Sequence, residues 1–118
     1  MNESSDRTHD RILIVDDTPS NIDLLSRMFV GRGFDILVAV DGPTGQQIAR
    51  RAMPDLILLD VMMPGQDGFE TCRLLKQDAA TADIPVIFIT AKDDAQSRLE
   101  GFQAGGVNYI SKPFQREE

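Results

Sequence analysis

The sequence predicts an α/β fold, a doubly wound parallel sheet with helices on both of its faces. Strand-like and helix-like segments alternate along the chain, which implies right-handed βαβ crossovers between parallel strands. The strand-like segments are short continuous apolar runs, the form expected of strands that are covered on both faces. The chain has 118 residues, of which 42% are hydrophobic, and this is enough for one domain with a single core.

The first strand and the first helix have clear boundaries. The run ILIV at residues 12–15 is the first strand. Thr18 is suited to the N-cap of the next helix and Pro19 to its first position. Gly31 and Gly33 end this helix. Its apolar residues recur at helical spacing, at Ile22, Leu25 and Phe29.

The middle of the chain predicts two further strands and two helices. The second strand spans residues 34–40, and the third spans residues 55–60. Between them lies a less regular helix at residues 43–53, which contains Gly45. A third helix follows the third strand and is marked by the apolar positions Phe69, Cys72 and Leu75.

The last part of the chain completes the alternation. The segment IPVIFIT at residues 84–90 is the fourth strand. A fourth helix is expected at residues 93–104, with Leu99 and Phe102 facing inward. Residues 107–110 form a short fifth strand.

Charge and composition limit the function classes. Nineteen acidic residues against 12 basic ones give a net charge of −7, so direct contact of this domain with nucleic acid is not expected. A single cysteine, Cys72, excludes a disulfide framework, and no apolar run is long enough to cross a membrane. We expect a cytoplasmic protein with a flexible polar leader at residues 1–10 and one domain at residues 11–118.

Polar residues follow the ends of the predicted strands. Each aspartate among them could simply cap the next helix or lie in a solvated turn, and the threonine and lysine could serve only the strand and the surface. In doubly wound sheets, however, ligands bind beyond the carboxyl ends of the strands, so these side chains are expected to share one edge. The residues are Asp16, Asp17, Asp60, Thr90 and Lys112.

The chemistry of this set points to a metal and a phosphoryl group. Three carboxylates at one edge repel one another unless some are protonated or a cation lies among them. Oxygen ligands favour Mg²⁺, with Mn²⁺ as a substitute, and the one histidine, His9, lies in the leader. A hydroxyl and an ammonium group fit the oxygens of a phosphoryl group. Asp60 ends the most apolar strand, and we expect it to be the nucleophile that forms an aspartyl phosphate.

Four motifs together resemble the receiver domains of two-component response regulators. They are ILIVDD (12–17), LILLDVMMPGQDG (56–68), IFITA (87–91) and YISKPF (109–114), and they occur in the family's order. The resemblance implies a flavodoxin-like sheet of five parallel strands in the order 2-1-3-4-5. It also implies a signalling domain that catalyses only its own phosphorylation and its slow autodephosphorylation, and not an ordinary enzyme.

The resemblance assigns roles to the acidic residues. Asp60 would accept the phosphoryl group from the phosphohistidine of a histidine kinase or of a histidine phosphotransfer protein. Asp17 would bind Mg²⁺ directly, and Asp16 would bind it directly or through water. Asp60 itself and the backbone carbonyl of Met62 would complete the set of metal ligands.

Further roles are implied near the C-terminal end. Lys112 would pair with the phosphoryl group, and Thr90 would donate a hydrogen bond to it. Tyr109 resembles the aromatic switch residue that turns inward when Thr90 moves, although it could also be an ordinary amphipathic residue of an edge strand. The peptide bond between Lys112 and Pro113 is expected to be cis, which would let the lysine turn back to the site.

The sequence departs from the family after the last motif. Receiver domains continue into a fifth helix, whereas this sequence stops at Glu118, so that helix is truncated or missing. Either the native domain is unusual or the sequence is part of a longer protein, and we expect the second, with an output domain downstream. A homodimer through the face of the fourth helix and fifth strand is also expected, as is the absence of membrane contact.

Two other classes share parts of this pattern. A hydrolase of the haloacid dehalogenase type also phosphorylates an aspartate after an apolar strand, but it uses a second acid two residues later, where this chain has Met62. A flavin or nucleotide binder needs a glycine loop that cradles phosphate, and neither G-x-G-x-x-G nor G-x-x-x-x-G-K-[ST] occurs. The glycines at 31, 33, 105 and 106 are better interpreted as helix stops.

Overall fold

The computed structural model of the chain describes residues 10–90, 95–106 and 108–111. Five strands alternate with four helices in these residues. The strands are β1 (Arg11–Val15), β2 (Asp35–Ala39), β3 (Leu56–Asp60), β4 (Val86–Thr90) and β5 (Asn108–Ser111). The helices are α1 (Pro19–Val30), α2 (Gly42–Ala52), α3 (Gly68–Gln77) and α4 (Ala95–Ala104).

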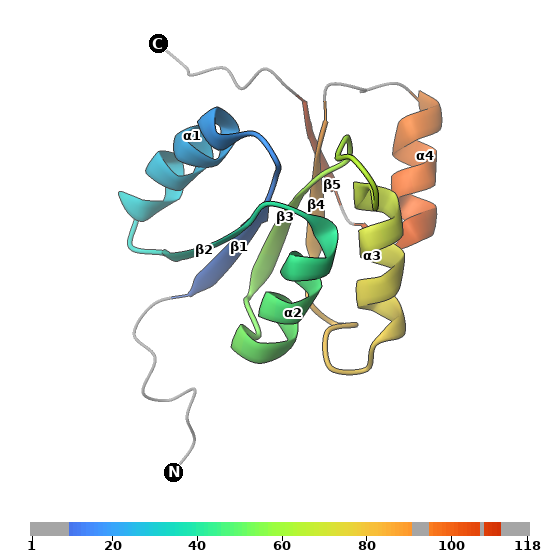
Figure 1. The fold of residues 1–118 in the computed structure, drawn as a ribbon, viewed down its shortest axis with the longest axis horizontal. Coiled ribbons are helices and arrows are strands. Elements are labelled where there is room, and N and C mark those ends of the chain that lie inside the picture. Colours follow the sequence, from blue (N-terminus) through green and yellow to red (C-terminus); the bar gives the residue numbers. More distant parts are fainter. Residues whose placement is uncertain (1–9, 91–94, 107, 112–118) are drawn as a thin grey trace.

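The strands form one parallel sheet in the order β2-β1-β3-β4-β5 (Figure 1). This order confirms the predicted doubly wound α/β fold of the flavodoxin-like type. Each predicted strand and helix is found, and most of the described boundaries agree within one or two residues. Because all strands run in the same direction, their carboxyl ends meet at the upper edge of the sheet in Figure 1.

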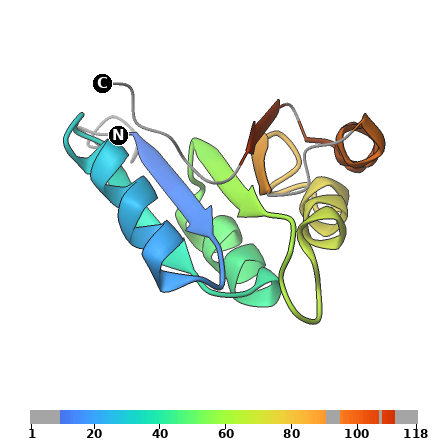
Figure 2. The same cartoon turned by 90° about the horizontal axis from the view of Figure 1, so that it is seen from above.

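The sheet separates two apolar layers. The side chains of β1 alternate between them, so that Leu13 and Val15 join the larger cluster and Ile12 and Ile14 join the smaller one. The larger cluster takes its helical residues from α2, α3 and α4, whereas the smaller one contains Leu25 of α1. Helix α1 therefore covers one face, and α2, α3 and α4 cover the other (Figure 2). The continuous apolar run of β1 is explained by this two-sided burial.

The start of α1 differs in detail from the prediction. Thr18 is the N-cap residue, as expected, but its side chain makes no capping hydrogen bond. Its hydroxyl instead lies 3.5 Å from Oδ1 of Asp17, and its backbone N–H donates to Oδ1 of Asp16 at 2.9 Å. The backbone N–H and the hydroxyl of Thr18 thus contact the two aspartates that follow β1, and the hydroxyl does not cap the helix.

The orientation of α4 corrects a second prediction. Leu99 and Phe102 were expected to face inward, but their side chains are 57% and 54% exposed. The helix buries Gly101 and Ala104 instead. These small residues let the backbones of α3 and α4 approach closely, and the thiol of Cys72 donates a hydrogen bond to the carbonyl of Ala104 at 3.2 Å. Helical spacing alone does not reveal that small side chains form the packed face.

The environment of Cys72 keeps its thiol protonated. Burial raises the pKa of this thiol to about 11, and the nearby charges of Lys76 and Arg73 offset only part of the effect. The side chain is fully inaccessible to solvent. Cys72 therefore acts as a small core residue and hydrogen-bond donor, as its apolar position in the third helix predicted.

Among the predicted helix stops, Gly106 has an additional function in packing. Gly33 and Gly105 have positive φ angles of 90° and 109°, which suit glycine at the end of a helix. A Cβ atom on Gly106 would collide with the ring of Phe88. This glycine therefore leaves space for a core aromatic residue of β4.

Several predictions lie outside the described residues. They concern the leader up to residue 9, the side chains of Lys112 and Pro113 with the bond between them, and the fifth helix. No helix in the described ranges has the length and apolar character needed to span a membrane.

Candidate metal-binding site

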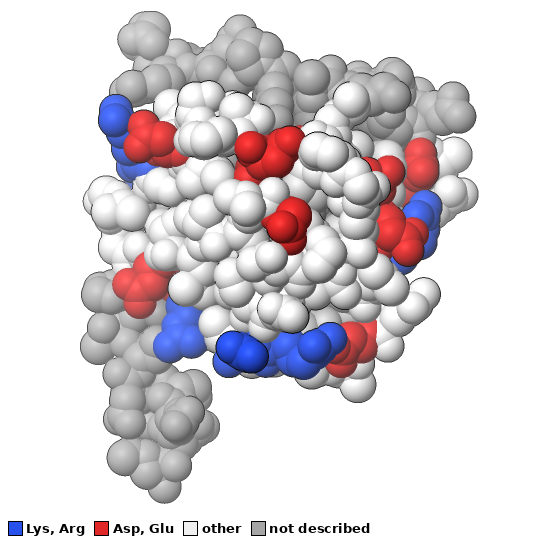
Figure 3. All heavy atoms as spheres, viewed as in Figure 1, with Lys and Arg blue, Asp and Glu red and all other residues white. Residues whose placement is uncertain are grey.

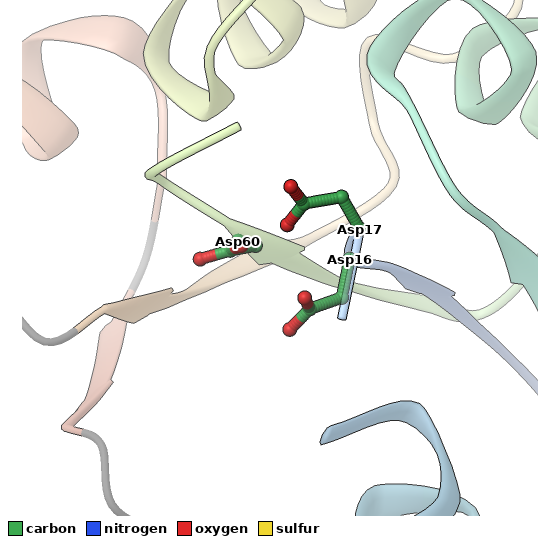
Figure 4. A group of neighbouring side chains, drawn as sticks. All are labelled: Asp16, Asp17 and Asp60. Atoms are coloured by element: carbon green, nitrogen blue, oxygen red, sulfur yellow. The ribbon is translucent and has the colours of Figure 1, made fainter. Parts of the chain in front are cut away.

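Three aspartates meet where β1 and β3 end. Asp16 and Asp17 directly follow β1, and Asp60 is the last residue of β3. The two strands are hydrogen-bonded neighbours in which Val15 lies beside Leu59. One carboxylate oxygen from each aspartate lies within 4.8 Å of the others (Figure 4). The structure thus brings together the three acids that the sequence placed at one edge.

Two of these carboxylates are buried. Asp16 and Asp60 are 0% and 1% exposed, whereas Asp17 is exposed. Oδ1 of Asp60 accepts a hydrogen bond of 3.3 Å from the backbone N–H of Met62, and Oδ1 of Asp16 accepts the N–H of Thr18. Burying charged carboxylates side by side is costly, because they lose hydration and repel one another. A cation at this position would lower that cost.

The donor set fits Mg²⁺. All three side chains offer carboxylate oxygens, which are the hard ligands that Mg²⁺ and Mn²⁺ prefer, and the set includes neither nitrogen nor sulfur. The exposed position of Asp17 leaves one side of the cluster open to water, which suits an ion that retains several water ligands. On the face shown in Figure 3, basic side chains lie along the lower edge and also at the upper left and the right, where they adjoin acidic ones. The attraction for a cation comes from the three carboxylates that lie close together.

The loop between β3 and α3, residues 61–67, folds back onto Asp60. The N–H of Gly68 donates to the carbonyl of Val61 at 3.0 Å. A Cβ atom on Gly68 would collide with the carbonyl oxygen of Asp60 and lie 2.8 Å from the Cα of Val61. Helix α3 therefore begins in direct contact with the backbone of the site, and a glycine is required there. The sequence motif at residues 56–68 includes Gly68 but does not indicate this role.

The other predicted site residues can be placed only by their backbones. Thr90 is the last residue of β4, the strand next to β3, and it pairs with Ser111 of β5. Tyr109 lies in β5 opposite Phe88. The two residues are thus on adjacent strands, as predicted. Their side chains, and Lys112 as a whole, lie outside the described residues.

Comparisons with known proteins agree with this arrangement. The family model for the response regulator receiver domain matches residues 12–118. The DNA-binding dual master transcriptional regulator RpaA of Synechocystis is 47% identical over 108 residues, which cover 92% of this chain and 45% of RpaA. This chain thus spans less than half the length of that relative.

Solved structures show the same fold. The chemotaxis protein CheY4 of Vibrio cholerae superimposes with a TM-score of 0.87 at 27% identity, over 92% of this chain and 90% of CheY4. The receiver domain of the sensor histidine kinase PA1611 of Pseudomonas aeruginosa gives 0.83 at 30% identity, over 92% and 88% of the two chains. That domain was solved with a magnesium ion coordinated in its active site cleft. With the family model matched along nearly the whole sequence, this chain belongs to the response regulator receiver domain family.

Proposed function

We propose that this chain is the phosphoacceptor domain of a two-component system and that Asp60 carries the phosphoryl group. A carboxylate oxygen of Asp60 attacks the phosphorus of a phosphohistidine on a histidine kinase or a histidine phosphotransfer protein. The P–N bond breaks, and the imidazole retains the bonding electron pair and takes up a proton. The observation that carries the proposal is the buried Asp60 at the end of β3, within 4.8 Å of two further carboxylates.

When bound, Mg²⁺, or Mn²⁺ in its place, would neutralise part of the negative charge of the carboxylates and the phosphoryl oxygens. Asp16, Asp17, Asp60 and the Met62 carbonyl would hold the ion. Lys112 and Thr90 bind the phosphoryl oxygens through an ammonium and a hydroxyl group. The magnesium ion in the PA1611 receiver domain supports this assignment.

The proposed response is a change in packing near β5. Thr90 moves toward the phosphoryl group, and Tyr109 occupies the space that it leaves. The adjacent strands β4 and β5 support this coupling.

The exposed Leu99 and Phe102 of α4 support a homodimer that uses the face of α4 and β5. We infer that the domain is cytoplasmic. We also infer that an output domain follows it in the full-length protein, in keeping with the greater length of RpaA.

Phosphorylation by a small donor tests the proposal. Incubation with acetyl phosphate and Mg²⁺ is expected to add one phosphoryl group per chain, measured by intact-protein mass spectrometry. Hydroxylamine should remove it, because acyl phosphates react with this nucleophile, and a chelator present from the start should prevent the addition. Release of inorganic phosphate with rapid turnover, without a labelled protein, would favour a hydrolase and contradict the proposal.

Met62 is expected to make the phosphorylated state long-lived. Its side chain is 54% exposed and lies two residues beyond Asp60, where it can neither donate nor accept a hydrogen bond that orients an attacking water. Replacing Met62 with Asn should speed loss of the phosphoryl group by about tenfold, if water positioning contributes ~1.4 kcal/mol to the barrier. The decay can be followed by mass spectrometry after the donor is removed.

Met28 provides the control for this substitution. It is also exposed, at 47%, but lies in α1, so Met28→Asn should leave the decay rate unchanged. An equal or slower decay in Met62→Asn would refute this explanation of the lifetime without affecting the assignment of Asp60.

A further inference from the structure

Gln66 connects the β3–α3 loop to two helices. Its Nε2 donates one hydrogen bond to Oε1 of Gln46 in α2 at 2.6 Å and another to Oγ1 of Thr71 in α3 at 2.9 Å. The Thr71 hydroxyl in turn donates to the carbonyl of Asp67 at 2.8 Å. Both N–H groups of the Gln66 carboxamide are therefore used, and the three side chains form one continuous chain of hydrogen bonds.

This network lies in a closely packed position. Thr71 is fully buried, and the side chains of Gln46 and Gln66 are partly buried. At Gly42, the first residue of α2, a Cβ atom would collide with Oγ1 of Thr71 and lie 2.5 Å from Nε2 of Gln66. The absence of a side chain at Gly42 leaves the space that the carboxamide occupies. A hydrogen bond in such partly desolvated surroundings is stronger than one at an open surface.

The β3–α3 loop, which contains Gln66, also contains Met62 and directly follows Asp60. At its beginning, the N–H of Val61 donates to the carbonyl of Ile89, and the N–H of Met62 donates to Asp60. At its end, Gly68 packs against the backbone of Asp60. Between these attachments lies Gly65, with a φ of 77° and open space around it. In this intervening part of the loop, Met63 is buried in the larger apolar cluster, and the Gln66 carboxamide adds a hydrogen bond to α2.

We propose that Gln66 is a positioning residue for the metal site, which holds the β3–α3 loop against α2 and α3 so that the Met62 segment keeps the place required for binding Mg²⁺. This inference rests on the proposed function. Without the two hydrogen bonds, the loop samples other positions, and ordering it again reduces the affinity for the ion.

The experiment measures Mg²⁺ affinity by isothermal titration calorimetry well below the melting temperature of each variant. Gln66→Leu removes both donors at similar volume, and Gln46→Leu removes the acceptor on α2. Each is expected to raise the Kd for Mg²⁺ by about threefold to tenfold, the range for loss of one or two partly buried hydrogen bonds. Gln46→Glu retains the acceptor oxygen and should keep an affinity at least as high as that of the unmodified chain.

The double variant and a neighbouring glutamine separate positioning from general destabilisation. Gln46→Leu with Gln66→Leu should weaken binding no more than Gln66→Leu alone, because the two residues share one interaction. Gln47→Leu, at the exposed neighbour on α2, should leave the Kd unchanged. In NMR relaxation measurements, the amides of residues 62–66 should become more mobile in Gln66→Leu, while those of β1 and α1 keep their order.

The outcomes distinguish this inference from the proposed function. If the unmodified chain binds Mg²⁺, Asp17→Asn loses binding and Gln66→Leu retains the original Kd, then the positioning role is wrong and the proposed function stands. An equal loss of affinity in Gln47→Leu would also overturn the positioning role. If the unmodified chain binds no Mg²⁺, both are wrong.

Discussion

Replacing Asp60 with Asn is expected to abolish phosphorylation by acetyl phosphate. The carboxamide has no anionic oxygen to attack phosphorus. Asp16 is also buried and has the same acidic neighbours, but it follows β1, whereas Asp60 is itself the last residue of β3. Intact-protein mass spectrometry should show full labelling of the original chain and none of the variant. The variant should remain folded, because it replaces one of three neighbouring carboxylates with a neutral group of the same shape.

A surface aspartate provides the control for this loss. Asp23 on α1 forms an exposed ion pair of 3.1 Å with Arg27, so Asp23→Asn removes the same charge outside the acidic cluster. This variant should be labelled like the original chain. Equal labelling of Asp60→Asn would contradict the assignment of the phosphoacceptor.

Replacing Gly68 with Ala is expected to lower the free energy of unfolding by about 3 kcal/mol, at the upper end of the usual range for overpacking. The new methyl group would collide with the carbonyl oxygen of Asp60. The methyl carbon is bonded directly to Cα and the oxygen is part of the backbone, so rotation about a side-chain bond cannot relieve the collision. Alanine favours helices more than glycine does, by up to about 1 kcal/mol, but this gain is smaller than the steric cost. Urea unfolding followed by circular dichroism measures the change.

The same variant should also be phosphorylated more slowly, because relief of the collision moves the start of α3 away from Asp60. Gly31→Ala is the matched control. Gly31 follows α1 with a φ of −63°, and a Cβ atom there would approach no atom more closely than 3.8 Å. It should leave stability and labelling nearly unchanged. A Gly68→Ala variant as stable as Gly31→Ala would show that the close approach at Asp60 is not required.

The fold and the acidic cluster were predictable because local patterns determine them. Continuous apolar runs such as ILIV at 12–15 indicate strands covered on both faces, and alternation with helices fixes the parallel topology. Once the strands are parallel, residues at their ends must meet. Asp16, Asp17 and Asp60 therefore came together in the structure as the sequence suggested.

Other features depend on contacts between distant segments, and no local sequence pattern indicates them. Leu99 and Phe102 have the spacing of a buried helical face, yet α4 buries Gly101 and Ala104, because close packing against α3 requires small residues. The close approach of Gly68 to Asp60 and the hydrogen bond from Gln66 to Gln46 likewise join residues that are not neighbours in the sequence. A glycine or glutamine in a loop is compatible with many environments, so only the three-dimensional structure identifies its role.

The most direct test of Asp60 as the phosphoacceptor is to locate the phosphoryl group chemically. The acyl phosphate formed with acetyl phosphate and Mg²⁺ can be reduced with borohydride, which converts the modified aspartate into homoserine, and tandem mass spectrometry of the peptides then identifies the residue. We expect homoserine at position 60 and at no other aspartate. Homoserine at Asp16, Asp17 or elsewhere, with Asp60 unchanged, would contradict it.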